Sequence, residues 1–472
     1  MRRIHSASHF KEMANHKNTD INTISLVYHP ELSLNYFEAI KHKPWAMLLR
    51  SPAHDHSDNR YDILVANPIA TIETKGKHSR IRMEGQETSS HSDPFSIIAD
   101  LQDSLVPHVN NQAWADYPFI GGALGYFAYD LGRQVESIPE NALDDISLPD
   151  MAIGLYNWAL IVDHNKQVAN LVGIGIEAVH TWLESVKSQH IDNSTDFAVT
   201  SEWTSNMSQS EYAEKFNTIQ DYLQSGDCYQ INLTQRFNAS YSGDEWQAYR
   251  LLEDNNKAPF SAFLRLDDHA IISISPERFI ALNDGCIETK PIKGTMPRSS
   301  VPKDDLINAE ILANSAKDQS ENLMIVDLLR NDIGRVAQPG SVCVPKLFNI
   351  ESFPAVHHMV STITAKLDDD KSATDLLRAC FPGGSITGAP KVRAMEIIEE
   401  LEPHRRSVYC GSIGYISRHG RMDTSITIRT LIAKDSQLYV WAGGGIVADS
   451  KVGSEYQETY DKLSKILPIL SS

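Results

Sequence analysis

Short apolar runs separated by turn residues make up the first part of the chain. Residues 45–49 and 61–65 have the length and composition of buried strands. Residues 151–163 alternate weakly and end in an apolar strand, and residues 167–176 predict one more. The run 121–127 is rich in glycine without phosphate-loop spacing, so we interpret it as a strand that packs closely against its neighbours.

Helical spacing becomes clear after residue 208. Ser208 and Glu211 have the spacing of a capping box, apolar residues follow at helical intervals, and Gly226 ends the helix. Next, residues 229–234 alternate between apolar and polar, which predicts a half-buried strand. Further helices are predicted at Pro302 onward and at residues 317–331, 373–380, 392–401 and 454–469. Because strands and helices come in mixed groups, the pattern favours an α+β fold with antiparallel sheets.

The chain divides most naturally near residues 188–208, a polar stretch rich in Ser, Thr, Asn and Asp. It is the best candidate linker, although a long surface loop inside one domain is equally consistent. We expect residues 1–20 to form a flexible tail, because no apolar run follows their basic residues as a secretory signal requires. Residues 21–200 then form the N-terminal part, and residues 208–470 form the part with most of the candidate chemistry.

Composition narrows the classes of protein. The chain has 472 residues, 43 Lys and Arg against 61 Asp and Glu, and a formal net charge of −18, which argues against nucleic acid or an anionic membrane as a partner. Five cysteines without a C-x-x-C pair argue against a disulfide framework or a thiolate zinc site and indicate a reducing compartment. The sequence contains no apolar stretch of about 18 residues and therefore predicts no membrane helix. We expect a soluble cytoplasmic protein.

Lys293 stands at the centre of the segment PIKGT (291–295). A predicted strand at 286–289 precedes it, and Gly294 allows the backbone to bend or to approach a ligand closely. The spacing therefore places Lys293 at a strand end with open space beside it. Alone, a Lys-Gly pair is more often a solvated turn, so its meaning depends on the other segments.

Two pairs of acids share a spacing. Asp318 and Glu321 lie three residues apart on one predicted helix, and Glu455 and Glu458 repeat this arrangement on the last helix. If the helices face each other, the carboxylates form an oxygen-rich site that suits Mg²⁺. Alternatively, each pair only complements the dipole at a helix start.

The glycine-rich segment 383–391 resembles a phosphate loop only in part. Ala389 stands where the loop needs lysine, and Lys391 is followed by Val392 instead of Ser or Thr. Backbone N–H groups at the following helix start can still hold a carboxylate.

Two cations near the end of the chain are candidates for binding a second carboxylate. Arg429 falls in a predicted half-buried strand, and Lys462 follows Glu458 by one helical turn. Ordinary ion pairing, with Lys462 serving Glu458, is the alternative. Glu277 and His358 each adjoin a strand, and neither indicates a site by itself.

Taken together, these segments resemble the chorismate-utilising enzymes from about residue 21 onward. The motifs that carry the resemblance lie at 44–52, 121–133, 275–279, 291–295, 321–336, 383–398 and 443–450. Each motif alone is weak, and jointly they are specific. The resemblance implies an α+β chorismate-binding fold, like that of anthranilate synthase component I. Two large, mainly antiparallel sheets pack face to face in it with helices outside, and residues 208–470 form the catalytic region.

The resemblance also implies chorismate as the substrate, which has two carboxylates, a cyclohexadiene ring and a ring hydroxyl. By position, Glu321 and Glu458 are similar to direct Mg²⁺ ligands, and Asp318 and Glu455 to carboxylates outside them. Glu277 is similar to the general acid, with His358 beside it. The positions similar to substrate-binding ones are Ser385, Tyr409, Arg429, Gly445 and Lys462.

Lys293 separates the subgroups, because anthranilate synthases have PIAGT where this chain resembles the PIKGT of aminodeoxychorismate synthase component I. The implied reaction is Mg²⁺-dependent conversion of chorismate and ammonia to 4-amino-4-deoxychorismate, on the route to p-aminobenzoate and folate, with neutral Lys293 as covalent nucleophile. No cysteine has the G-x-C-x-G setting of a glutaminase, so a separate glutamine amidotransferase subunit, component II, is expected to supply the ammonia.

Other functions are weighed against this one. Lys293 argues against anthranilate synthase component I. Gln230 argues against isochorismate synthase, where a water-activating lysine stands. The incomplete phosphate loop argues against a nucleotide-binding module, and the full set of matched acids argues against a catalytically silent subunit. Arg50 replaces the acid of the tryptophan-regulation motif of anthranilate synthases, so feedback by tryptophan is not predicted.

Overall fold

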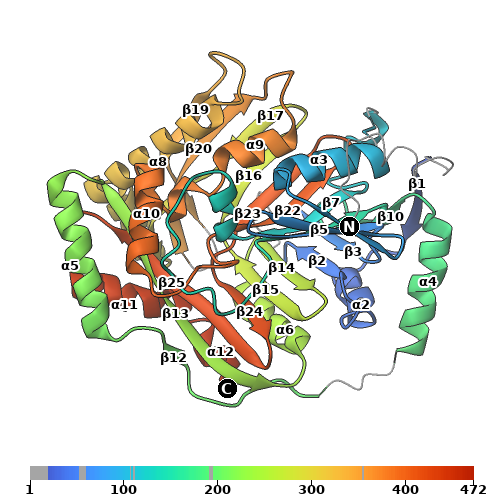
Figure 1. Cartoon of the computed structure of the whole chain (residues 1–472), viewed down its shortest axis with the longest axis horizontal. Helices are drawn as coiled ribbons and strands as arrows, with labels where there is room; N and C mark the ends of the chain where they lie inside the picture. Colours follow the sequence, from blue (N-terminus) through green and yellow to red (C-terminus); the bar gives the residue numbers. More distant parts are fainter. Residues whose placement is uncertain are drawn as a thin grey trace.

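The computed structural model describes residues 20–52, 60–106, 108–109, 112–190, 195–352 and 356–471. Residues 1–19, which make up nearly all of the predicted tail, lie outside these ranges. Within them, no helix is both long and apolar enough to cross a membrane. Element labels are those of Figure 1.

The first sheet mixes strands from both ends of the chain. Its order is β1 (Asn22–Leu26), β10 (Val168–Gly173), β9 (Trp158–Asp163), β3 (Tyr61–Val65), β2 (Met47–Arg50), β14 (Phe260–Arg265), β15 (His269–Ser275), β24 (Thr430–Lys434), β25 (Gln437–Ile446), β13 (Gln230–Ser242) and β11 (Ala198–Val199). β12 (Thr204–Ser205) and β21 (Gly388–Ala389) also pair with β13. Its described pairs are antiparallel.

The second sheet is built in the same way. Its order is β18 (Ile292–Pro297), β20 (Val356–Lys366), β17 (Cys286–Thr289), β16 (Arg278–Asn283), β23 (Met422–Ile426), β22 (Ser412–Ser417), β7 (Gly122–Phe127), β8 (Met151–Tyr156), β4 (Ala70–Lys75), β5 (His78–Met83) and β6 (Gln86–Ser90), and β19 (Cys343–Ser352) also pairs with β20. These pairs are antiparallel too. The predicted α+β class with antiparallel sheets is confirmed.

Alternating side chains hold the two sheets face to face. In β9, Ala159 and Ile161 join the core between the sheets, whereas Trp158, Leu160 and Val162 join a second core on the opposite face. That second core packs under helices outside the sheet (Figure 1), namely α2 (Leu32–Glu38), α4 (Ile176–Gln189), α6 (Glu245–Asn256) and α12 (Leu467–Leu470). The strands of the first sheet are therefore covered on both faces.

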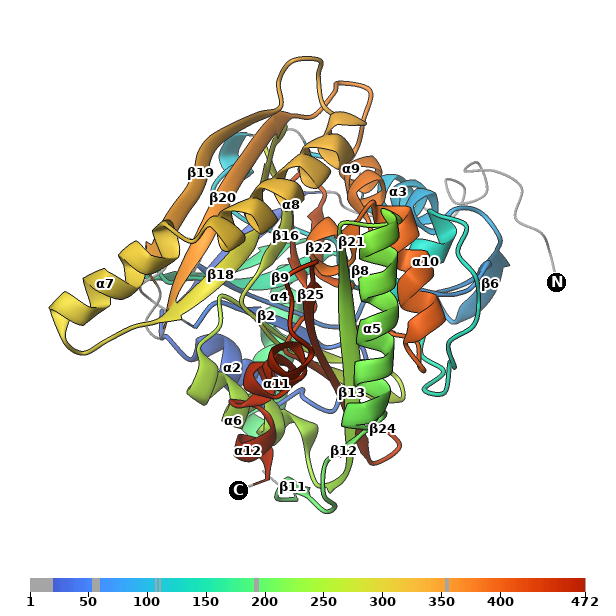
Figure 2. The same cartoon turned by 90° about the vertical axis from the view of Figure 1, so that its left-hand side faces the viewer.

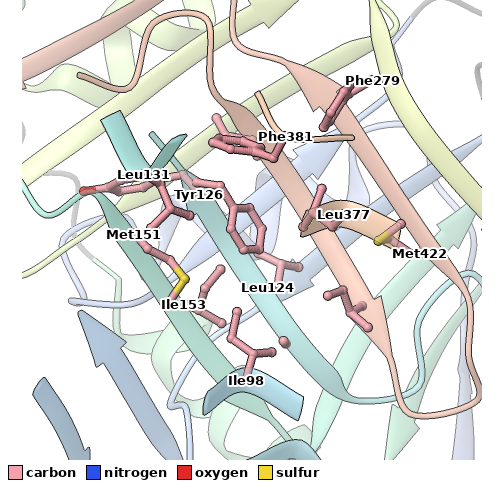
Figure 3. Packing of buried hydrophobic residues seen from close by; sticks show 14 of the residues in the cluster. Ile98, Leu124, Tyr126, Leu131, Met151, Ile153, Phe279, Leu377, Phe381 and Met422 are labelled. Carbon is pink, nitrogen blue, oxygen red and sulfur yellow. The ribbon is translucent and has the colours of Figure 1, made fainter. Parts of the chain in front are cut away.

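The outer face of the second sheet is covered by α3 (Pro94–Leu105) and α9 (Ala373–Cys380). Figure 3 shows Ile98 of α3 close to Ile153 of β8. It also shows Leu377 of α9 on the same side of the second sheet as Phe381. In the glycine-rich strand β7, a Cβ on Gly125 would lie 2.1 Å from the Ala152 carbonyl oxygen. The predicted close packing of this strand is thus observed.

Residues on either side of 188–208 share both sheets. In the first sheet β2 pairs with β14, and in the second sheet β7 pairs with β22. Both cores therefore draw on the whole described chain.

The predicted helix ends are observed where the capping is local. α5 (Gln209–Ser225) begins at a complete capping box of Ser208 and Glu211 and ends at Gly226, whose φ is +81°. The other helices are α7 (Pro302–Ala313), α8 (Ala316–Gly334), α10 (Lys391–Leu401) and α11 (Val452–Leu463), with short 3₁₀ segments η1 (Gln112–Trp114), η2 (Tyr129–Gln134) and η3 (Gly384–Ile386).

The single helix predicted at residues 454–469 is wrong. α11 ends at Leu463, and the chain turns before the short α12 begins at Leu467. Pro468 explains the break, because its ring lacks an N–H and would clash with the carbonyl of Ser464 in a continuous helix.

Candidate active site

One cavity of about 590 Å³ lies where α8 and α11 approach the ends of both sheets. These two helices lie on the same side of the molecule, with β18 and β25 between them (Figure 2). All of the site residues predicted from the sequence line this cavity: Glu277, Lys293, Asp318, Glu321, His358, Ser385, Tyr409, Arg429, Gly445, Glu455, Glu458 and Lys462.

A bulge in β18 sets the direction of Lys293. The pairing of β18 with β20 slips between Lys293 and Thr295, and Gly294 between them has φ +76°. A Cβ on Gly294 would lie 2.8 Å from the Asp318 carboxyl carbon. Gly294 therefore lets α8 approach the strand, and Lys293 lies inside β18 instead of at the predicted strand end.

Lys293 lines the cavity and is partly buried there. Burial lowers its pKa; Lys462 adds to this effect, while Glu321, Glu277 and Glu458 oppose it. A lowered pKa increases the fraction of neutral amine, the form that can act as a nucleophile.

Glu277 lies across the cavity as a nearly buried acid. Its side chain accepts a hydrogen bond at Oε1 from the Ser385 hydroxyl, 3.1 Å away. Burial raises the pKa of Glu277 to about 7, although Lys293, Ser385 and Lys462 counteract the rise. An acid with such a pKa can donate a proton near neutral pH.

His358 lies in β20, next to the bulge. Its Nδ1 lies 2.9 Å from the Thr295 hydroxyl oxygen, within hydrogen-bonding distance. Thr295 therefore fixes the imidazole ring relative to Lys293, two residues earlier in the same strand. Sequence reasoning did not single out Thr295, although it belongs to the PIKGT segment.

Arg429 is a cation without a counterion. It lies in the turn between β23 and β24 with φ +51°, so its predicted place in a strand is wrong. The chain crosses between the two sheets at this turn, and an alternating pattern does not reveal such a crossing. Burial lowers the pKa of Arg429, and no carboxylate of the described residues forms an ion pair with it. An anionic ligand would supply the missing charge.

Carboxylates from α8 and α11 gather in the same cavity, beside β25. A Cβ on Gly444 of β25 would lie 3.1 Å from Glu458 Oε1 and 3.2 Å from Glu455 Oε2. Glu455 Oε2 is buried, and no described residue donates a hydrogen bond to it. Burial raises the pKa of Glu321; the charges of Lys293 and Lys317 counteract the rise, and those of Asp318 and Glu455 add to it. The accumulated negative charge would be stabilised by a cation.

These acids fit a metal that is shared with a substrate. Within the described ranges, no three His, Cys, Asp or Glu side chains form a group that could hold a metal ion. Mg²⁺ needs only one or two carboxylates, together with water and an anionic ligand oxygen. In this structure Lys462 Nζ lies 2.7 Å from Glu458 Oε1 and Lys317 Nζ lies 3.8 Å from Glu321 Oε1. The ion pair of Lys462 with Glu458 that the sequence suggested is therefore present. Lys462 also donates a hydrogen bond to the Gly443 carbonyl oxygen.

Strand β13 contributes residues that the sequence did not identify. Its polar side chains Asn232 and Thr234 line the cavity, and the strand is buried on both faces near them. The predicted half-buried strand is therefore wrong, because the polar face meets the cavity and not solvent. Polar residues at alternate positions on a central strand were the available signal. Trp441 also lines the cavity and stacks on Tyr409 with ring centroids 6.0 Å apart.

Lys391 has a structural partner. Its Nζ lies 2.6 Å from Asp332 Oδ2 and donates to the carbonyl oxygens of Cys380 and Pro382. The lysine of the glycine-rich segment therefore has partners inside the protein and is not available to bind a phosphate. This geometry agrees with the failed phosphate-loop pattern and gives no support to a nucleotide-binding module.

Comparisons with known proteins agree with this geometry. A family model described as chorismate binding enzyme matches residues 46–468. Aminodeoxychorismate synthase component 1 of Salmonella typhimurium is 58% identical over 445 residues, covering 94% of this chain and 97% of that protein. The Escherichia coli protein of the same name is 56% identical over 446 residues, covering 94% and 97%.

A solved structure shows a similar fold. The crystal structure of anthranilate synthase component I from Streptococcus pneumoniae is 33% identical, has a TM-score of 0.76, and covers 87% of this chain and 93% of that one.

Proposed function

The chain belongs to the chorismate binding enzyme family, and we propose that it works as component I of an aminodeoxychorismate synthase, converting chorismate and ammonia to 4-amino-4-deoxychorismate. The resemblance expected from the sequence motifs is confirmed at this level. The observation that carries the proposed chemistry is the amine of Lys293, which lines the cavity and has its pKa lowered by burial.

Chorismate is a dianion, and the cavity offers two places for carboxylates. Arg429, with Lys462, holds the carboxylate at one end. Ser385, Tyr409 and the bare backbone at Gly445 complete the surroundings of the substrate. These roles are supported by the shared cavity and by the lack of a protein counterion for Arg429.

The first half-reaction adds Lys293 to the ring. The neutral amine attacks the ring carbon beside the carboxylate, the double bonds shift, and the bond to the ring hydroxyl breaks. Glu277 gives its proton to the departing hydroxyl, which leaves as water. As the carbon–nitrogen bond forms, the amine gives one proton to the Glu277 carboxylate, which is thereby protonated again. His358, held by Thr295, lines the same cavity.

The second half-reaction releases the lysine. Ammonia attacks the carbon that lost the hydroxyl, the double bonds shift back, and the bond to Lys293 breaks. The amine takes up a proton as it leaves, so the overall change is chorismate plus ammonia to aminodeoxychorismate plus water. The enolpyruvyl group is retained throughout.

Mg²⁺ would be held by Glu321 and Glu458, with Asp318 and Glu455 outside them, and when bound it would neutralise the ring carboxylate of the substrate. The crowded, partly unsatisfied acids of α8 and α11 support this assignment.

Ammonia comes from a separate glutamine amidotransferase subunit, component II, in agreement with the name component 1 of the relatives. Gln230 favours ammonia over water as nucleophile, because its fully buried amide cannot act as a base. We place the reaction in the cytoplasm, on the route to p-aminobenzoate and folate, with neither nucleic acid nor a membrane as partner.

A product assay tests the proposed function. Purified chain is incubated with chorismate, Mg²⁺ and an ammonium salt without glutamine, and the products are identified by mass spectrometry. A para-amino product that retains the enolpyruvyl group is expected. Anthranilate plus pyruvate would instead assign the chain to anthranilate synthase, the alternative suggested by the similar solved structure. If neither appears, addition of a glutaminase subunit separates dependence on the partner from an inactive site.

A further inference from the structure

Asn232 ties two segments together beside the cavity. Its side chain lies in β13, is 9% exposed and lines the cavity. Asn232 Nδ2 donates to the Ser385 carbonyl oxygen at 3.1 Å, and Asn232 Oδ1 accepts from Gln230 Nε2 at 3.1 Å. The backbone N–H of Asn232 donates to the Thr387 carbonyl oxygen at 2.9 Å. The strand therefore holds the segment around Ser385 by both main chain and side chain.

This segment carries the hydroxyl that contacts the acid. Ser385 Oγ donates to Glu277 Oε1 at 3.1 Å. Because hydrogen bonds weaken steeply with distance and angle, a small displacement of the Ser385 backbone would break this contact. Two hydrogen-bonded links thus meet at Ser385: Gln230 and Asn232 hold its main-chain carbonyl, and its side-chain hydroxyl contacts Glu277.

The amide of Asn232 has little freedom to move. A Cβ on Gly445, on the paired strand β25, would lie 3.0 Å from Asn232 Oδ1 and 2.7 Å from Gln230 Nε2. The bare backbone of Gly445 therefore leaves room for these two amides and confines them. Confinement of this kind keeps the hydrogen bond to Ser385 in one geometry.

We infer that Asn232 is a positioning residue that orients the general acid Glu277 by fixing Ser385. This role rests on the proposed function, in which Glu277 protonates the departing hydroxyl. Asn232 acts through Ser385 and does not transfer a proton itself. A plain structural role, in which Asn232 only satisfies buried carbonyls, is the competing explanation and makes a different prediction for the pH profile.

The pH profile separates the two explanations because the Ser385 hydrogen bond stabilises the charged form of Glu277. Loss of this bond raises the pKa of Glu277. Activity that needs protonated Glu277 then extends to higher pH. Lys293 from β18 and Lys462 from α11 are the charged groups that also act on Glu277, and neither contacts Asn232 through a hydrogen bond of the described residues.

The experiment compares Asn232→Ala, Ser385→Ala and the double variant with the wild-type chain. We expect Asn232→Ala to lower kcat roughly 10-fold or more, because a misplaced catalytic group loses rate steeply. The alkaline limb of kcat/KM should move up by roughly half to one pH unit in both single variants. The double variant should show no further displacement, because both changes remove one hydrogen bond.

Controls keep the outcome decisive. Asn238→Ala alters the same residue type on the same strand, where the side chain contacts Thr204 and not the cavity, and should leave the profile unchanged. Asn232→Leu fills a similar volume without the hydrogen bonds and replaces the alanine variant if that one does not fold. An unmoved alkaline limb despite lowered kcat would overturn the positioning role. Absence of the para-amino product from wild-type chain, also after addition of a glutaminase subunit, would instead refute the proposed function.

Discussion

Two arginines of this protein have opposite surroundings. Arg50, on the helix-covered face of the first sheet, donates from Nε to Asp62 at 3.0 Å and from Nη1 to Glu253 at 2.7 Å. Burial alone would lower its pKa, but the two carboxylates more than offset this and raise it. Among the residues that the structure describes, no carboxylate pairs with Arg429 in the cavity, and burial lowers its pKa.

Two lysines repeat the contrast. Lys391 is buried against Asp332, whereas Lys293 extends into the cavity among Glu321, Glu277 and Lys462, with burial as the largest influence on its pKa. When the protein partners of a buried charge are complete, removing one partner leaves the other uncompensated and destabilises the fold. A buried charge left incomplete is stabilised only by something that binds. The difference distinguishes structural charges from those of the site.

The largest expected effect concerns the acids of α8 and α11 that we propose hold Mg²⁺. Glu321→Ala and Glu458→Ala should each abolish Mg²⁺-dependent activity, because each removes a carboxylate that would contact the ion. Titration of activity with Mg²⁺, after treatment with a chelator, measures this. Asp327→Ala is the matched control, since Asp327 lies on the same helix but pairs with Arg330 at the surface. Titration curves like that of the wild type would remove these acids from the metal site.

Removal of the lysine nucleophile comes next. Lys293→Ala should lower formation of aminodeoxychorismate by roughly 10³-fold or more, because the covalent route through the amine is lost. Single-turnover assays with mass spectrometry would measure both the rate and the loss of a covalent adduct.

Lys290→Ala, three residues earlier and outside the cavity lining, should keep activity. Full turnover of the Lys293 variant with unchanged intermediates would rule out the covalent role.

The two arginines should affect different properties when each is replaced: substrate turnover for Arg429 and stability of the fold for Arg50. Arg429→Ala should lower kcat/KM for chorismate by roughly 10²-fold, as expected for a lost hydrogen-bonded charge pair, with little change in the free energy of unfolding. Arg50→Ala should instead destabilise the fold by about 3–5 kcal/mol, because Asp62 and Glu253 remain buried without their cation. Steady-state kinetics and chemical denaturation of both variants test this. If both variants lose mainly kcat/KM, or both lose mainly free energy of unfolding, the distinction drawn between the two arginines is wrong.

Local signals in the sequence predicted local structure. The capping box of Ser208 and Glu211 and the terminal Gly226 fixed α5, because these interactions involve residues within one or two helical turns. The run 151–163 shows the limit: it divides at Asn157 into β8 and β9, which belong to different sheets. Nothing in its alternation marks the crossing, because both strands are buried on both faces.

The site shows the same limit. Spacing placed Asp318 with Glu321 and Glu455 with Glu458, but only the fold brings α8 and α11 to one cavity. The roles of these residues came from resemblance to a family and not from spacing. Asn232 escaped notice because its polar strand face was assigned to solvent, and burial there depends on strands distant in sequence.

The smallest effect follows from the acid itself. Because the pKa of Glu277 is about 7 in the free protein and the acid must be protonated to act, kcat/KM should fall about tenfold per pH unit above that value. Below it, activity should decline only as Lys293 becomes protonated. In Glu277→Gln, which cannot titrate, the residual activity should lose the alkaline limb and keep the acidic one. An alkaline limb that persists in this variant would assign the proton to another group.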